Sequence, residues 1–147
     1  MSRTKKQKRS KEEVQAYYAE LRQQWAEAKA KSQEAPVIAI YEELRKMGLK
    51  DISLYNVSLV YWQATAVGFD GLPYIDFKTY NAWRDSGFQV EKGQKSQVLS
   101  ITWVGPERDE ADSDGSEEEN KPRWPKATHL FHRSQVKPIL EIEMEAV

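Results

Sequence analysis

The residues best suited to chemistry lie in one stretch, 77–95, where aromatic, cationic and amide side chains alternate. Flat rings stack on nucleobases and cations pair with phosphates, so this combination is typical of surfaces that bind single-stranded nucleic acid. Near its end, Lys92 and Lys95 flank Gly93, which can adopt a positive φ. A turn of that kind presents backbone N–H groups beside both ammonium groups. The sequence therefore predicts an anion site just before a strand.

A second interpretation of the stretch is purely structural, and composition alone gives it equal weight. A short helix and a turn would bury Trp83 and Phe88, at least one of which we expect in the core, and leave the lysines in water. Under the binding hypothesis, each exposed ring that stacks on a base contributes roughly 1–3 kcal/mol. The predicted phosphate contacts are Lys78, Arg84, Lys92 and Lys95, and the predicted stacking residues are Tyr80, Trp83 or Phe88, and Trp103.

Catalytic chemistry has little support, and we expect a protein that is not an enzyme and uses no cofactor or metal. The chain has no Cys, which excludes thiolate catalysis and Cys-ligated zinc. His129 and His132 are three residues apart on a predicted strand, which places them on opposite faces. The acids Asp70, Asp76 and Asp85 resemble ordinary turn and capping residues. The sequence contains no zinc-protease helix, nucleophile elbow or Walker loop.

Charge is segregated along the chain. Residues 107–120 contain eight acids and one Arg, a local charge of −7, so the remainder carries +6 within a total of −1. The beginning of the chain is also basic, so a polyanion can meet a positive surface. The acidic run is most simply a solubilising loop. The alternative function is a protein-interaction module whose acidic loop mimics nucleic acid toward a basic partner.

Membrane insertion and secretion are not expected. No apolar run approaches the roughly 20 residues that cross a bilayer, and no apolar stretch follows the basic N-terminus. Together with the lack of Cys, these features predict a cytoplasmic protein without a membrane partner.

Two helices are predicted in the first third of the chain. Ser10 and Glu13 have capping-box spacing, and an apolar stripe at helical intervals follows to about Ser32. Pro36 suits the first turn of a second helix, and Gly48 is a natural stop.

A third helix, 54–64, is predicted behind the cap Ser53. Its apolar residues surround most of the axis, so we expect it to be the central buried helix, with a strand as the alternative because of its β-branched and aromatic content. A short strand over 74–77 and a short helix that begins at Thr79 and ends at Gly87 follow.

The second half predicts a long β-hairpin from strands 98–103 and 127–136, with the acidic run in its connection. The fold class is therefore α+β, with about four helices packed on a small antiparallel sheet. The predicted parts are a disordered basic tail (1–9), a single domain (10–138) with a mobile acidic loop (107–120), and a C-terminal tail (139–147).

Several short blocks together resemble the N-terminal domain of ArdC-type antirestriction proteins, which is similar to the N-terminal part of certain plasmid primases. The blocks are residues 55–63, 77–83, 87–95 and 131–135, and their order agrees over about 37–138. They match a helix with Asn and a final Gln, a Lys/Thr–Trp helix, a Gly-x-x-Val-x-Lys-Gly-Glu-Lys-Gly turn leading into a strand, and a later strand ending in Gln. This chain has Gln94 in place of the usual Glu and Ser96 in place of the usual Gly.

The resemblance implies a domain that binds single-stranded DNA. In full-length members it precedes a zinc metalloprotease-like domain. Because this chain ends before such a domain would begin, we expect the DNA-binding half alone, with a second protein or domain possible in trans, and a mobile element or bacteriophage as its origin. The positions that transfer are Asn56, Gln63, Trp83, Gln89, Lys92, Gly93, Lys95 and Gln135. Replacing Glu by Gln94 removes a negative charge beside the anion site, which should favour phosphate binding.

Overall fold

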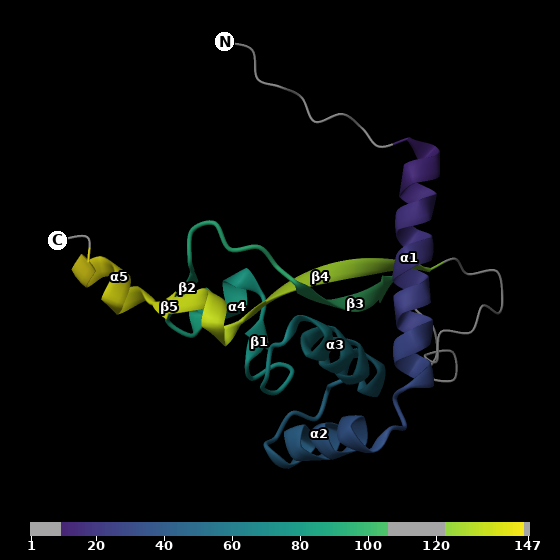
Figure 1. Cartoon of the computed structure of the whole chain (residues 1–147), viewed down its shortest axis with the longest axis horizontal. Coiled ribbons are helices and arrows are strands. Elements are labelled where there is room, and N and C mark those ends of the chain that lie inside the picture. Colours follow the sequence, from purple (N-terminus) through teal and green to yellow (C-terminus); the bar gives the residue numbers. More distant parts are fainter. Residues whose placement is uncertain (1–9, 106–122, 146–147) are drawn as a thin grey trace, which may run out of the picture.

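The structure is a computed structural model that describes residues 10–105 and 123–145. Within these residues it has five α-helices, five β-strands and a short 3-10 helix (Figure 1). The predicted α+β class is confirmed. The predictions for the basic tail (1–9) and the acidic run (107–120) lie outside the described residues.

Helix α1 (Lys11–Ala30) begins with the predicted capping box. The Ser10 hydroxyl accepts from the Glu13 backbone N–H at 3.1 Å, and the Glu13 carboxylate accepts from the Ser10 N–H at 3.1 Å. Helix α2 (Ala35–Lys46) carries Pro36 in its first turn, as predicted. Figure 1 shows α1 crossing the end of the hairpin, with α2 below α3 at the bottom of the view.

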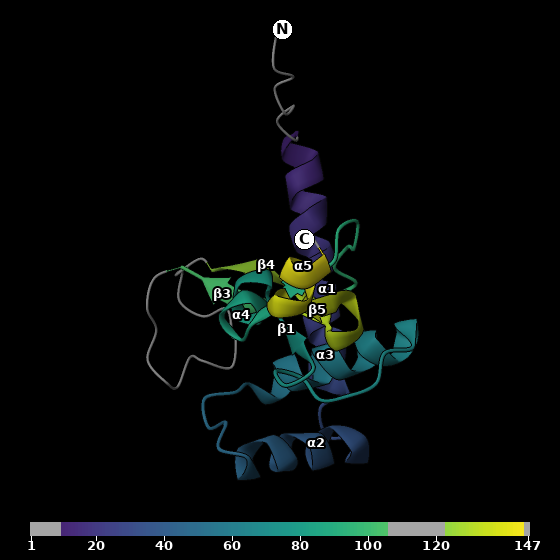
Figure 2. The same ribbon diagram turned by 90° about the vertical axis from the view of Figure 1, so that its left-hand side faces the viewer.

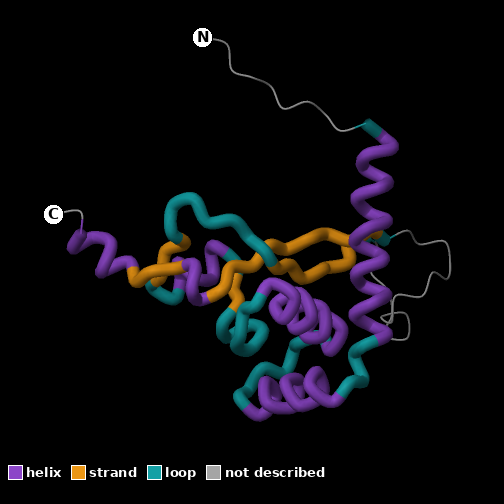
Figure 3. The backbone as a smooth tube through the Cα atoms, viewed as in Figure 1, coloured by secondary structure: helices purple, strands orange, loops and turns teal. Residues whose placement is uncertain are grey.

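Helix α3 (Leu54–Val67) is the centre of the fold. The Ser53 hydroxyl caps it by accepting from the Asn56 N–H at 3.2 Å. It contributes a buried side chain to each of three hydrophobic clusters, including Val57 and Val60, which are at most 1% exposed. Burying such a side chain stabilises the fold by about 1.5–3 kcal/mol. The helix prediction is confirmed, and Figure 3 shows α3 lying between α2 and the hairpin.

Strands β3 (Val98–Val104) and β4 (Trp124–His132) form the predicted antiparallel hairpin, with Val98 opposite Leu130 and Val104 opposite Trp124. A two-residue strand, β1 (Phe77–Lys78), pairs with the other edge of β4, so the strand order is β1-β4-β3. The prediction of a strand over 74–77 is wrong, because Tyr74 has a φ of 70° that interrupts an extended chain.

The prediction of one continuous strand over 127–136 is also wrong. Residues Arg133–Gln135 form a 3-10 turn, η3, because the His132 ring accepts from the Ser134 N–H and caps it. Beyond η3, strand β5 (Val136–Pro138) pairs antiparallel with β2 (Phe88–Val90) in a second, two-stranded sheet. The sequence pattern did not indicate this pair of strands.

Two short helices flank the second sheet. Helix α4 (Tyr80–Asp85) is capped by the Thr79 hydroxyl, as predicted. Helix α5 (Ile139–Glu145) occupies the segment predicted as a tail, and its first N–H donates to the Gly87 carbonyl at 2.9 Å. In Figure 2, α5 lies toward the viewer, beside β5 and in front of the hairpin. Across residues 10–105 and 123–145, none of the helices combines the length and the hydrophobicity that a membrane crossing requires.

Candidate nucleic-acid interface

An open depression of about 720 Å³ lies where the second sheet meets α4, α5 and the hairpin. We refer to this depression as the groove. It is lined by Tyr80, Gln89, Val90, Glu91, Lys92, Gln94, Phe131, Lys137 and Ile142. Tyr80, Gln89 and Lys92 are predicted contact residues, and the fold brings them together with side chains from the far end of the chain. The groove contains rings, amides and cations, together with the acid Glu91.

Tyr80 is the predicted stacking residue that is open to solvent. It is 41% exposed, and the Gln89 side-chain amide donates to its hydroxyl oxygen, which holds the ring at the groove. Arg84 lies one helical turn further along α4 and is exposed. Residues four apart share one face of a helix, so the guanidinium lies on the same side of α4 as the ring.

The turn after β2 has the predicted geometry. The Gln94 N–H donates to the Glu91 carbonyl at 3.1 Å, and Gly93 has a φ of +87°, as the third residue of a type II turn requires. A Cβ at Gly93 would meet open space, so the backbone conformation alone favours glycine there. Lys92 and Lys95 are both exposed. In the described part of the chain, the N–H groups of Lys92 and Gly93 make no hydrogen bond.

Gln135 anchors this turn from beneath. It is 3% exposed, and its side-chain amide donates to the Lys95 carbonyl at 2.8 Å and to the Gln94 side-chain oxygen at 3.1 Å. Its backbone carbonyl accepts from the Glu91 N–H at 2.9 Å. The prediction that Gln135 itself contacts nucleic acid is therefore corrected: its amide is buried and engaged within the fold, and it positions the turn.

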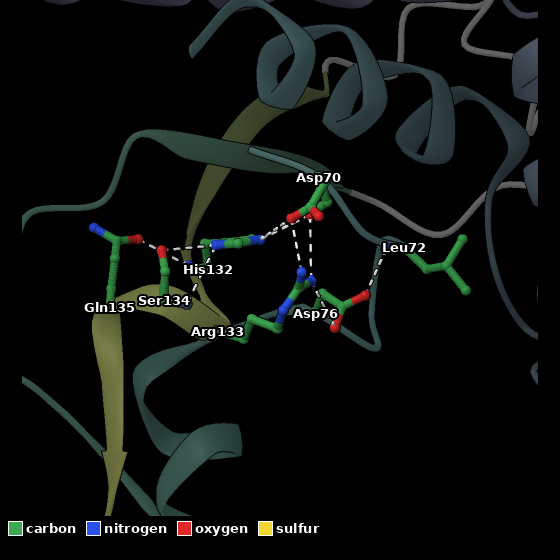
Figure 4. A network of polar contacts seen from close by, with 7 residues as sticks. All are labelled: Asp70, Leu72, Asp76, His132, Arg133, Ser134 and Gln135. Atoms are coloured by element: carbon green, nitrogen blue, oxygen red, sulfur yellow. Dashed lines mark hydrogen bonds and ion pairs between the residues drawn. The ribbon is translucent and has the colours of Figure 1, made fainter. Parts of the chain in front are cut away.

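A polar network fixes the segment from which Gln135 reaches the turn (Figure 4). The Arg133 guanidinium pairs with Asp70 at 2.7 Å and with Asp76 at 3.1 Å, which ties the loop after α3 to η3. The His132 ring is 4% exposed, stacks on Phe69 with centroids 4.4 Å apart, and donates from Nε2 to the Asp70 carbonyl at 2.7 Å. The network is structural, and residue type alone did not reveal it.

Trp83 is a core residue, which corrects its assignment as a stacking side chain. It is 5% exposed, its indole N–H donates to the Phe131 carbonyl at 2.9 Å, and Phe88 packs edge-on against it at 5.5 Å. The Lys78 ammonium lies 5.0 Å from the centre of the Trp83 ring and covers one face of it. Lys78 is therefore partly engaged within the fold, and neither residue lines the groove.

Asn56 and Gln63 lie on α3 and bind the outer edge of β3. The Asn56 amide exchanges two hydrogen bonds with the backbone of Ile101, at 2.9 and 3.0 Å. The Gln63 amide does the same with Leu99, at 2.7 and 3.1 Å. These amides take the place of a strand partner at the edge of β3, which corrects their assignment as contact residues: both are engaged within the fold and neither lines the groove.

Trp103 lies at the far end of the hairpin. It packs edge-on against Trp25 of α1 with ring centroids 5.9 Å apart. It is five positions along β3 from Val98, which is roughly 17 Å at about 3.3 Å per residue. The structure therefore does not bring Trp103 to the groove, and its placement in a common site with Lys92 is corrected.

The groove residues that sequence reasoning missed are Val90, Glu91, Gln94, Phe131, Lys137 and Ile142. Lys137 lies directly opposite Gln89 in the β2–β5 register. Lys137 can be assigned to the groove only if the strand is known to break at His132, and the sequence pattern contains no plain signal for that break.

Comparison with known families gives one result. A family model described as the N-terminal domain of the anti-restriction factor ArdC matches residues 9–131. Neither the curated proteins nor the solved structures yielded a match.

Proposed function

Because the chain belongs to the family of N-terminal domains of the anti-restriction factor ArdC, we propose that it is a non-catalytic domain that binds single-stranded DNA in the groove. The family indicates an antirestriction-related, DNA-binding role. The choice of an unpaired strand, and of the groove as its site, is our proposal.

The observation that carries the proposal is the exposed Tyr80 ring in a recess whose rim bears Lys92. A base can stack on such a ring only when it is not already stacked and paired inside a duplex. The recess therefore favours an unpaired strand, with little dependence on sequence from stacking itself. Lys92 and Lys95, with the N–H groups of the turn, are suited to adjacent phosphates, and Arg84, exposed on α4, offers a further cation.

Salt dependence gives the proposal a quantitative form. Each phosphate neutralised on a single strand contributes about −0.7 to the slope of log K against log salt. Contacts from Arg84, Lys92 and Lys95 therefore predict a slope of about −2. Tyr80→Ala should weaken binding by roughly 1–3 kcal/mol without changing this slope, because a stacking contact releases no counterion.

The test is fluorescence anisotropy with labelled single-stranded and duplex oligonucleotides across a range of salt concentrations. The variant Lys92→Glu/Lys95→Glu should lose affinity, whereas Lys46→Glu/Lys50→Glu makes the same change in charge at exposed positions near the end of α2. Failure of the parent protein to bind the single strand at low salt overturns the proposal. Equal losses in the two variants would reject the groove as the site.

A further inference from the structure

We propose that Gln94 is a further specificity-determining residue of the groove, and that its amide nitrogen presents hydrogen-bond donors to an oxygen of the bound strand. The inference rests on the proposed function and deepens it. Gln94 is exposed and lines the groove between the two lysines of the turn.

The orientation of the Gln94 amide follows from a chain of hydrogen bonds that starts at a backbone donor. The His132 N–H can only donate, and it lies 2.8 Å from the side chain of Gln135. The Gln135 atom that faces it must therefore be the oxygen. The opposite atom lies 2.8 Å from the Lys95 carbonyl, which can only accept, so it must be the amide nitrogen.

The second hydrogen of that nitrogen is directed at the side chain of Gln94, 3.1 Å away. A donor there requires an acceptor in return, so the Gln94 oxygen faces Gln135. The Gln94 nitrogen, with its two hydrogens, therefore points away from Gln135. No residue in the described part of the chain accepts a hydrogen bond from it.

The other amide in the groove has the opposite polarity. The Gln89 nitrogen donates to the Tyr80 hydroxyl and lies 3.4 Å from the Val90 carbonyl, which can only accept. The Gln89 oxygen therefore remains as an acceptor, with no partner among the described residues. The groove thus presents a donor at Gln94 and an acceptor at Gln89, and both residues line it together with Tyr80.

The group that suits Gln94 is an acceptor oxygen of the strand. Two sources supply it: a non-bridging phosphate oxygen and a carbonyl oxygen of a base. Position 94 lies between two lysines in the sequence, and a carboxylate there would repel either oxygen. The amide adds a donor at the same place without adding charge.

The decisive variant is Gln94→Glu. A carboxylate oxygen still accepts from Gln135, so the turn keeps its anchor, while the outward donor becomes a negatively charged acceptor. We expect affinity for single-stranded DNA to fall about tenfold or more, because a hydrogen bond to the strand is lost and a like charge is added. The matched control is Gln97→Glu, which adds the same charge three residues away at an exposed position outside the groove.

Three comparisons complete the experiment. An abasic oligonucleotide retains its phosphates, so a loss that persists on it assigns the contact to phosphate, and a loss confined to the base-bearing strand assigns it to a base. If Gln94→Glu also lowers the melting temperature, the affinity of Gln94→Met for single-stranded DNA tests the inference instead. This variant removes the donor without adding charge, and we expect its affinity to fall a few-fold. Equal affinities for Gln94→Glu and Gln97→Glu overturn this inference, whereas no binding by the parent overturns the proposed function.

Discussion

Replacing Gln135 with methionine removes the anchor of the turn while keeping a side chain of similar length. Three hydrogen bonds disappear: one from the His132 N–H and two that Gln135 donates to the turn. The His132 N–H belongs to a residue that is 4% exposed. Leaving such a donor unpaired costs about 1–3 kcal/mol.

The other two lost bonds cost less. Lys95 and Gln94 are exposed, so water can replace Gln135 as their partner, and each lost bond costs about 0.5–1.5 kcal/mol at most. We therefore expect the free energy of unfolding to fall by about 2–4 kcal/mol, a large part of the 5–15 kcal/mol typical of a domain. Chemical denaturation followed by circular dichroism measures this change.

Affinity should fall as well, for a different reason. Without Gln135 the turn must be ordered when the strand binds, and fixing the backbone of a single residue costs about 1–2 kcal/mol. The expected loss for single-stranded DNA is therefore about tenfold or more. Hydrogen exchange should also accelerate at residues 92–95 under conditions in which the hairpin amides remain protected.

Gln97→Met is the control, because it makes the same chemical change at an exposed neighbouring position. If Gln135→Met matched Gln97→Met in stability, in exchange at the turn and in affinity, the anchoring role would be refuted. A loss of stability with exchange and affinity unchanged would assign Gln135 to the fold alone.

Three further predictions follow from other parts of the molecule. Gln63→Leu leaves the Leu99 N–H and carbonyl unpaired and should lower the free energy of unfolding by about 2–4 kcal/mol. The folded variant should bind DNA with unchanged affinity, and a tenfold loss of affinity would show that Gln63 contacts the DNA. Burial raises the pKa of Tyr74, although a hydrogen bond from the Ser53 backbone partly lowers it, so the stabilisation from the neutral phenol is complete below pH about 10 and is lost as the pH rises through the folded-state pKa. Urea denaturation should then show a smaller loss of stability above pH 10 for Tyr74→Phe than for the parent, and parallel curves would contradict this. Deleting residues 107–120 should preserve or improve DNA binding, whereas loss of an interaction with a basic protein partner would favour the nucleic-acid mimic.

The helices were predictable because their signals are local. Ser10, Ser53 and Thr79 each accept a hydrogen bond from the N–H three residues ahead, so the cap and the helix start lie in one short window. The hairpin strands were predictable from alternation. The break at His132 was not, because it depends on a ring that caps η3 and is held by the distant Asp70 carbonyl. Without that break, the pairing of β2 with β5 cannot be found.

The site was predictable in the same uneven way. The turn at Gly93 follows from a local pattern of Lys, Gly and Lys, and the structure has the expected φ. Whether Trp83 or a neighbouring ring faces solvent depends on the Phe131 carbonyl, which lies 48 positions away in the sequence. Residue type therefore predicted the kind of surface, and nonlocal hydrogen bonds decided which ring is exposed.

The positions that transfer from the ArdC pattern serve two different purposes in this chain. Asn56, Gln63 and Gln135 direct their amides at backbone groups and hold β3 and the turn in place. Lys92 and Lys95 direct their charges into solvent from the turn that Gln135 holds. Both kinds of position belong to one motif because the lysines can contact a ligand only if the amides hold the turn in a fixed geometry. It follows that changes at the amides should act first on the fold of the site, whereas changes at the lysines should act on the salt dependence of binding and leave the fold intact.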